Sequence, residues 1–292
     1  MQKIVPHLWF DTEANEAAEF YTKAFPNSSI KSKTTISNTP SGDVVIITIS
    51  LAGLDFMLLN AGPTFKLNPS VSFLVACKSK AEVDAIYINL NDSASELMPL
   101  GEYPFSERYV WLQDKYGLSW QIMYMGERRV TSKITPTIMF VGDQCGHAEE
   151  ALQFYTSVFR DSEITDISRY GPEAEPDAEE SIKHASFRLE NQDFALMDSA
   201  YAHQFAFNEA ISLMVYCETQ EEIDYYWDSL SAVPEAEQCG WLKDKFGFSW
   251  QVVPRAMDQM FQENDPARLA RITDAFLKMK KFDLAELKRA AE

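Results

Sequence analysis

The segment Trp-Leu-Gln-Asp-Lys-Tyr-Gly-Leu-Ser-Trp-Gln at residues 111–121 decides the architecture, because it recurs as Trp-Leu-Lys-Asp-Lys-Phe-Gly-Phe-Ser-Trp-Gln at residues 241–251. Eight of the eleven positions are identical, which chance does not produce over that length. Shorter matches accompany it: Lys-Ile-Val-Pro at 3–6 is followed by Lys-Ile-Thr-Pro at 133–136. The chain is therefore predicted to be a tandem duplication with a junction near residues 126–132.

Each copy has the pattern of two β-α-β-β-β units. In the first unit a strand is expected at 4–10, and then a helix that begins at Asp11 or Thr12 and repeats apolar residues at helical spacing. Further strands are expected at 30–37, 44–51 and 56–60. The second unit shows a strand at 71–77, a helix capped by Ser79, and strands near 96–101, 109–113 and 119–125. Such a unit exposes an apolar sheet face, so the four units are expected to pair, either within the chain or across a dimer.

The predicted domains are residues 1–128, residues 132–256 and a helical C-terminal extension over residues 257–292. In the extension, Asp265-Pro266 is a typical helix start, and Asp283 with Glu286 has the spacing of a capping box. The extension either braces the second copy or contacts a second chain; the sequence does not decide between the two.

Composition limits the class of protein. The 292 residues are 46% hydrophobic and 24% charged, which is typical of a folded globular chain. A net charge of −18 disfavours nucleic acid as a partner. The apolar runs are too short to span a membrane and the start lacks the apolar stretch of a signal peptide, so we expect a cytoplasmic protein with no membrane partner. The four cysteines have no C-x-x-C spacing and are expected to be reduced thiols.

Several motifs identify a family resemblance. Pro-His-Leu-Trp-Phe-Asp at 6–11, Leu-Asn-Ala-Gly-Pro at 59–63 and Phe-Asn-Glu-Ala-Ile-Ser at 207–212, together with the long repeat, resemble the PhnB-like family of the vicinal oxygen chelate (glyoxalase/bleomycin-resistance) superfamily. The resemblance implies an α+β fold of tandem glyoxalase-like domains, each with two paired βαβββ units, followed by the C-terminal helices. The family is often labelled "3-demethylubiquinone-9 3-methyltransferase". No two of the eleven glycines form the G-x-G spacing of a cofactor-binding turn, so we expect no methyl transfer from S-adenosylmethionine.

The resemblance also implies where a site would lie. Active superfamily members hold a divalent metal in a cupped sheet, through His, Gln or Glu on the first and last strands of the units. The matching residues of this chain are His7, Ser72 and Gln121 in the first copy and Thr137, Ser212 and Gln251 in the second. The usual glutamate is thus glutamine in both copies, and an amide is a weaker ligand than a carboxylate. No cofactor is therefore assigned, and a divalent metal with His7 and Gln121 among its ligands remains an alternative.

Two functions remain open at this stage. In the first, the chain binds a small molecule in an aromatic-lined cup without a strong metal site. In the second, it is a metal-dependent lyase, isomerase or dioxygenase, so the sequence does not decide whether it is an enzyme. A homodimer is compatible with either. The residues predicted to line the ligand cavity are His7, Trp9, Asn60, Ser72, Trp120, Gln121, Thr137, Asp198, Ser212, Trp250 and Gln251.

Overall fold

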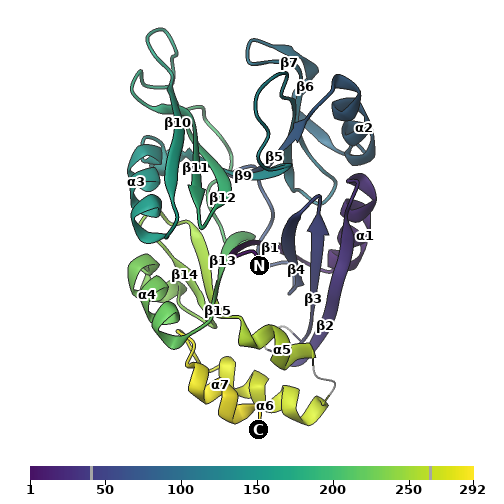
Figure 1. The fold of residues 1–292 in the computed structure, drawn as a ribbon, viewed down its shortest axis with the longest axis vertical. Helices are drawn as coiled ribbons and strands as arrows, with labels where there is room; N and C mark the ends of the chain where they lie inside the picture. Colours follow the sequence, from purple (N-terminus) through teal and green to yellow (C-terminus); the bar gives the residue numbers. More distant parts are fainter. Residues whose placement is uncertain (40–41, 263–264) are drawn as a thin grey trace.

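Two mixed β-sheets form the body of the molecule, and helices cover their outer faces (Figure 1). The computed structural model describes residues 1–39, 42–262 and 265–292. The strands of the first sheet, sheet A, are β1 (Ile4–Phe10), β2 (Ser29–Thr39), β3 (Gly42–Leu51), β4 (Leu54–Asn60), β13 (Ile211–Cys217), β14 (Trp241–Lys243) and β15 (Ser249–Pro254). They lie in the order β14-β15-β13-β1-β4-β3-β2.

Sheet B is the second sheet. Its strands are β5 (Val71–Cys77), β6 (Ser95–Tyr103), β7 (Ser106–Gln113), β8 (Ser119–Tyr124), β9 (Ile134–Val141), β10 (Glu163–Arg169), β11 (Ile182–Leu189) and β12 (Gln192–Ser199). Their order is β10-β11-β12-β9-β5-β8-β7-β6. The helices that cover the two sheets are α1 (Ala14–Ala24), α2 (Lys80–Leu90), α3 (Ala148–Val158) and α4 (Gln220–Leu230). This is the α+β arrangement of tandem glyoxalase-like units that the sequence predicted.

Each sheet contains one unit from each sequence copy. Sheet A joins the first unit of the first copy to the last unit of the second through the antiparallel pair β1 and β13, in which His7 lies opposite Ser212. Sheet B joins the other two units through β5 and β9, in which Ser72 lies opposite Thr137. The units therefore pair within one chain but between its two copies, which answers the question that the sequence left open.

Two local features differ from the expected unit. The fourth unit has a short 3₁₀ helix, η2 (Pro234–Ala236), where the second unit has β6, because fewer residues separate α4 from β14 than α2 from β7. Helix α1 begins after Glu13, and neither Asp11 nor Thr12 caps it. Instead the backbone N–H of Ala14 donates to Asn60 Oδ1 of β4 at 2.7 Å, so a tertiary contact takes the place of a local cap.

The long repeat folds as the same tight hairpin in both copies. Asp114 Oδ1 accepts the backbone N–H groups of Tyr116 and Leu118, and Oδ2 accepts the indole N–H of Trp120 at 2.9 Å. Gly117 has a φ of +91°, which favours glycine over residues with a side chain. Burial raises the pKa of Asp114 to about 6, against the bond from Trp120, which lowers it. The identical positions of the repeat are thus the ones that hold the hairpin and its tryptophan together.

The C-terminal extension contains α5 (Ala256–Gln262), α6 (Pro266–Phe276) and α7 (Leu284–Ala290). As expected, Asp265 and Asp283 cap α6 and α7 by accepting backbone N–H groups of their first turns. The backbone N–H groups of Cys239 and Gly240 donate to the carbonyl oxygens of Met279 and Lys280, at 2.9 and 2.8 Å. The extension is therefore hydrogen-bonded to the second copy, in line with the first of the two alternatives, a brace on that copy.

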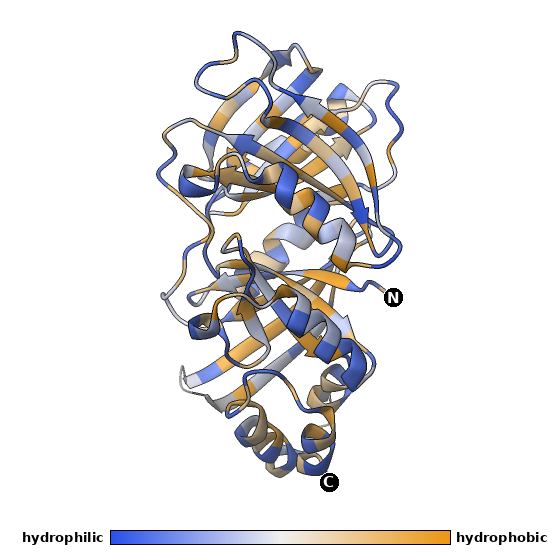
Figure 2. Ribbon diagram, turned by 90° about the vertical axis from the view of Figure 1, so that its left-hand side faces the viewer, coloured by the Kyte–Doolittle hydropathy of each residue, from blue (hydrophilic) through white to orange (hydrophobic). Residues whose placement is uncertain are grey.

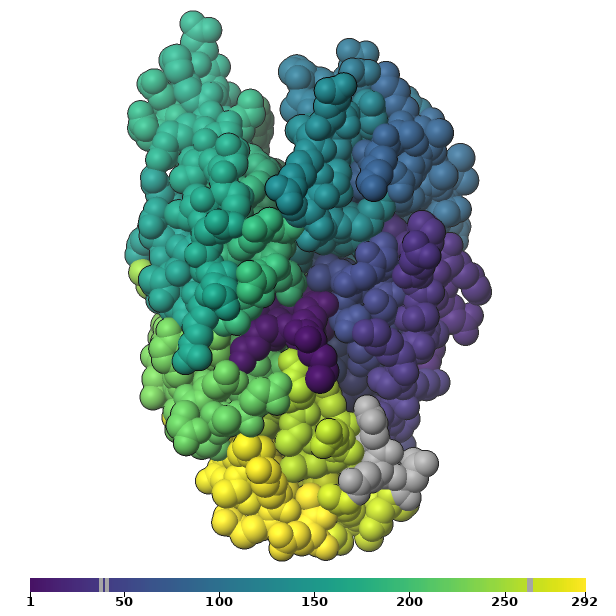
Figure 3. All heavy atoms as spheres, in the orientation of Figure 1, coloured from purple at the N-terminus to yellow at the C-terminus, as the bar shows by residue number. Residues whose placement is uncertain are grey.

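The two sheets are covered unequally. Figure 3 shows the C-terminal helices, in yellow, closing the lower end of the molecule, while a notch remains between the segments at its upper end. In Figure 2, orange residues alternate with blue or pale ones along strands, as expected where one face of a sheet packs on helices.

None of the helices built from the described residues combines the length and the apolar character that crossing a bilayer requires.

Candidate functional site

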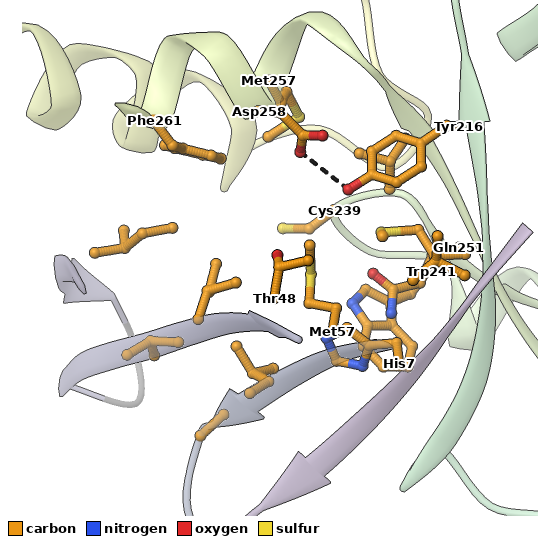
Figure 4. A pocket seen from close by; sticks show the side chains of 18 of the residues that line it. His7, Thr48, Met57, Tyr216, Cys239, Trp241, Gln251, Met257, Asp258 and Phe261 are labelled. Atoms are coloured by element: carbon orange, nitrogen blue, oxygen red, sulfur yellow. Dashed lines mark hydrogen bonds between the residues drawn. The ribbon is translucent and has the colours of Figure 1, made fainter. Parts of the chain in front are cut away.

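A cavity of about 780 Å³ lies between the concave face of sheet A and the C-terminal extension (Figure 4). Strands of both copies contribute to it, because sheet A is assembled from both. Its wall is mainly apolar, with Met57 and Leu59 from β4 and Met257 and Phe261 from α5 among the lining side chains. This size and character are typical of a site for a small organic ligand.

Polar side chains gather at one end of this cavity, where Figure 4 shows His7, Trp241 and Gln251 close together. Strand alternation explains their position, since each has neighbours in sequence that point to the helix side. Gln251 donates from Nε2 to Ser212 Oγ at 2.9 Å. The ring of His7 meets that of Trp241 edge-on, with centroids 5.2 Å apart. Burial lowers the pKa of His7 to about 3, so the imidazole is uncharged at neutral pH.

The wall of the cavity where β13 meets α5 carries a hydrogen-bonded pair. The Tyr216 hydroxyl donates to Asp258 Oδ1 at 3.0 Å, which joins β13 to α5 across the edge of the cavity. Burial raises the pKa of Asp258, and the bond from Tyr216 opposes that rise. The guanidinium of Arg255 lies over the Tyr216 ring, 4.3 Å from its centroid. Each polar group on this wall therefore already has a partner.

At the corresponding end of sheet B, protein side chains bond to both ends of the glutamine amide. Gln121 Nε2 donates to Ser72 Oγ at 2.8 Å, and the Tyr109 hydroxyl donates to Gln121 Oε1 at 2.8 Å. Thr137 stands where sheet A has His7. The predicted residues Ser72, Gln121 and Thr137 thus lie together, but in the other sheet from His7 and Gln251.

Four more predicted residues lie on the helix side of their sheets. Trp120 and Trp250 are fully buried there, and their indole N–H groups donate to the carboxylates of the two hairpin turns. Asp198, the counterpart of Asn60, accepts the backbone N–H groups of Gly146 and Ala148 at the start of α3. Of the predicted set, His7, Trp9 and Gln251 line the cavity, and Ser212 supports Gln251.

The residues at the superfamily's metal position do not suit a divalent metal. His7 and Gln121 belong to different sheets. The strands beside His7 place the Met57 thioether and the Ser212 hydroxyl opposite it, and Gln251 adds an amide. A thioether is a soft ligand, whereas hydroxyl and amide oxygens without a carboxylate bind borderline or hard cations weakly. In the part of the chain that the structure describes, no three His, Cys, Asp or Glu side chains converge on a point.

Sequence reasoning did not single out Tyr216, Asp258 or Cys239, which all line the cavity. Tyr216 follows Ser212 by four residues on one strand, so the alternation of β13 places it on the same face and was a usable signal. Cys239 stands where the repeat places Tyr109 in the first copy, so the repeat offset was a usable signal for it. Asp258 reaches the cavity only through the docking of the C-terminal extension, for which the sequence carried no signal.

Comparisons with known proteins agree with this architecture. The family model described as "3-demethylubiquinone-9 3-methyltransferase" matches residues 2–123 and again residues 132–253. A PhnB protein of Bacillus cereus, named after the same methyltransferase, is 38% identical; the match covers 42% of this chain and 99% of that one, with a TM-score of 0.40. Glyoxalase I from Zea mays matches over 89% of this chain and 97% of its own, with a TM-score of 0.56 at 10% identity.

The maize enzyme shows a shared fold and no more, because its sequence identity is low. No protein with a curated description matches the chain. The family model covers both copies, and the cavity is built from strands of both. The chain belongs to the PhnB-like family, as a tandem duplication with the glyoxalase fold.

Proposed function

We propose that this protein binds a small, uncharged and largely apolar molecule in the cavity of sheet A. The observation that carries the proposal is the cavity itself, with an apolar wall and a buried, uncharged His7 at one end. Burying apolar ligand surface supplies most of the binding free energy in such a site, and a few polar groups fix the orientation.

The proposal includes neither a resident divalent metal nor methyl transfer. The donor set around His7 supports the first point, because a thioether, a hydroxyl and an amide are a poor match for a borderline or hard cation. The glycine spacing supports the second, since no G-x-G turn is present for a nucleotide-like cofactor. The metal-dependent lyase, isomerase or dioxygenase remains the competing function.

Blocking the cavity tests the proposal. N-phenyl-1-naphthylamine, an uncharged apolar dye that fluoresces when bound, should bind the wild-type protein. Leu59→Trp places a large ring in the cavity and should weaken binding by at least about tenfold. Met197→Trp is the matched control: Met197 lies opposite Met139 in sheet B as Leu59 lies opposite Trp9 in sheet A. Dye binding that is lost equally in both variants, or is absent in the wild type, would contradict the proposal.

Elemental analysis distinguishes the competing function. Protein purified without chelator should contain no stoichiometric divalent metal, and His7→Ala should leave its metal content unchanged. One equivalent of zinc, manganese or iron that is lost in His7→Ala would favour the metal-dependent enzyme instead.

A further inference from the structure

The two sheets have a glutamine and a serine at corresponding positions, so the hydrogen bonds of the two glutamines can be compared. In both, the glutamine Nε2 donates to a serine Oγ, at 2.8 Å for Gln121 and 2.9 Å for Gln251. The amide group is thereby held with its oxygen turned away from the serine. The two amide oxygens can then be compared directly.

In sheet B a phenol occupies the place next to this oxygen. Tyr109 is 3% exposed, and its hydroxyl donates to Gln121 Oε1 at 2.8 Å. In sheet A the repeat places Cys239 at the position of Tyr109. The Cys239 thiol donates to the carbonyl oxygen of Phe276, at 3.5 Å, and does not reach the glutamine. Gln251 is 6% exposed, and no donor among the described residues bonds to its Oε1.

A second polar group at the same end has also lost its partner. In sheet B the indole N–H of Trp111 donates to Ser119 Oγ at 2.7 Å. The counterparts in sheet A are Trp241 and Ser249, and Ser249 Oγ is buried without a hydrogen-bond partner among the described residues. The Trp241 N–H therefore does not repeat this bond. Since Trp241 pairs with Gln251 across β14 and β15, a free donor and a free acceptor are neighbours on the cavity wall.

His7 adds a third group without a partner. Its Nδ1 is buried with no hydrogen bond in the part of the chain that the structure describes. The ring packs edge-on against Trp241 and lines the cavity with it (Figure 4). Leaving the Gln251 oxygen and the Trp241 N–H unpaired at the cavity costs free energy that a ligand recovers by pairing with them. Among common groups, a hydroxyl is suited to this place because it both donates and accepts.

The charged residues of the cavity disfavour an anionic ligand. Two side-chain cations line it among the described residues, Lys31 and Arg255. Lys31 is paired with Asp55 at 2.6 Å and Arg255 with Glu218 at 2.6 Å. A carboxylate or phosphate group on the ligand would therefore meet no unpaired side-chain cation at this wall, and would lose its hydration without compensation.

From this comparison we infer that the ligand of sheet A is a neutral phenol or fused-ring hydroxyaromatic compound, whose hydroxyl donates to Gln251 Oε1 and accepts from the Trp241 indole N–H. The inference rests on the proposed function, because it specifies the molecule that the cavity takes. The Tyr109 side chain of sheet B is the model for the ligand: a phenol hydroxyl on a flat apolar ring, bonded to the equivalent glutamine oxygen. The apolar wall on α5 and β4 then faces the body of the compound.

The test compares 2-naphthol with 2-methoxynaphthalene as competitors of N-phenyl-1-naphthylamine. The two compounds have the same ring system, but the ether cannot donate. One hydrogen bond corresponds to roughly a fivefold to tenfold difference in affinity, so 2-naphthol should displace the dye at a correspondingly lower concentration. Gln251→Leu should remove this preference, and Tyr109→Phe, which removes the phenol hydroxyl of sheet B, should leave it unchanged. Trp241→Phe should reduce it and serves as the second variant if Gln251→Leu does not fold.

The outcomes separate the two proposals. If the wild type binds the dye but both competitors displace it equally, the hydroxyaromatic assignment is wrong and the binding function stands. A preference for 2-naphthol that survives in Gln251→Leu or disappears in Tyr109→Phe would also overturn the assignment. If the dye does not bind at all, the proposed function itself fails.

Discussion

Gly240 lies where the C-terminal extension contacts sheet A. Replacing it by alanine should weaken the attachment of the extension to the sheet. Gly240 has a φ of +83°, and its backbone N–H donates to the carbonyl oxygen of Lys280 at 2.8 Å. A Cβ at this position would lie 2.5 Å from Cε2 of Phe282 and 2.9 Å from the carbonyl oxygen of Val252. Neither contact is tolerable, so the Phe282 ring and the main chain around it have to move.

The size of the effect follows from two contributions. The left-handed backbone conformation costs an alanine about 1–2 kcal/mol. Phe282 is 3% exposed, and displacing its ring from the core loses about 1.5–3 kcal/mol of burial. The free energy that holds the extension on sheet A should therefore fall by about 2.5–5 kcal/mol. Hydrogen exchange measures this directly, and amides of α6 and α7 should exchange at least about fiftyfold faster in Gly240→Ala.

Gly247→Ala is the matched control. Gly247 has a φ of +79°, but a Cβ there would meet no atom within 4 Å. This variant carries the backbone strain without the collision, so exchange in α6 and α7 should stay at the wild-type rate. Equal exchange rates of these helices in Gly240→Ala and Gly247→Ala would show that the contact with Phe282 does not hold the extension in place.

Two further predictions concern titrating groups. Burial raises the pKa of Asp114 to about 6 from an ordinary value of 3.8. The folded state therefore binds this proton more tightly than the unfolded chain does. Protonated Asp114 stabilises the folded state fully below the ordinary pKa, and this contribution is lost as pH rises through about 6. In urea unfolding at pH 4 to 7, Asp114→Asn should remove about 3 kcal/mol of this pH dependence, and an unchanged slope would contradict the assignment. Burial lowers the pKa of His7 to about 3, so the dissociation constant of N-phenyl-1-naphthylamine should change less than about twofold between pH 5 and 8. A tenfold weakening at pH 5 that His7→Phe abolishes would show that His7 becomes protonated there.

Much of the fold could be predicted from the sequence because the repeat is long and its residues have local roles. The Asp, Gly and Trp of the repeated hairpin bond to one another within a few residues, so their spacing carries the information. The pairing of units could not be predicted in the same way. All four first strands are buried along nearly their whole length, and nothing in β1 distinguishes β13 from β5 as its neighbour.

The candidate site was predicted in part for the same reason. His7 and Gln251 were recognised as polar positions of first and last strands, and the structure brings them to one cavity. The prediction that Gln121 lies beside His7 is wrong, because the two residues belong to different sheets. Whether they lie together depends on which units pair, and the sequence does not specify this. The prediction that Trp120 and Trp250 line the cavity is wrong, because both lie on the helix side of their sheets. Each directly precedes a glutamine, Gln121 or Gln251, that lies on the opposite, concave face. Neighbours on a strand point to opposite faces, so this placement could have been excluded from the sequence alone.

Because each sheet contains strands of both copies, the side chains on the two concave faces (the two bowls) can change independently. A pair of identical single-copy chains related by a two-fold axis could build the same two sheets, but each bowl would then contain the same side chains. Fusing the copies end to end removes this constraint, because a change in one copy alters only one bowl. Histidine in one and threonine in the other, or cysteine against tyrosine, become independent choices. The concave face of one sheet can therefore change its side chains while the other keeps its own.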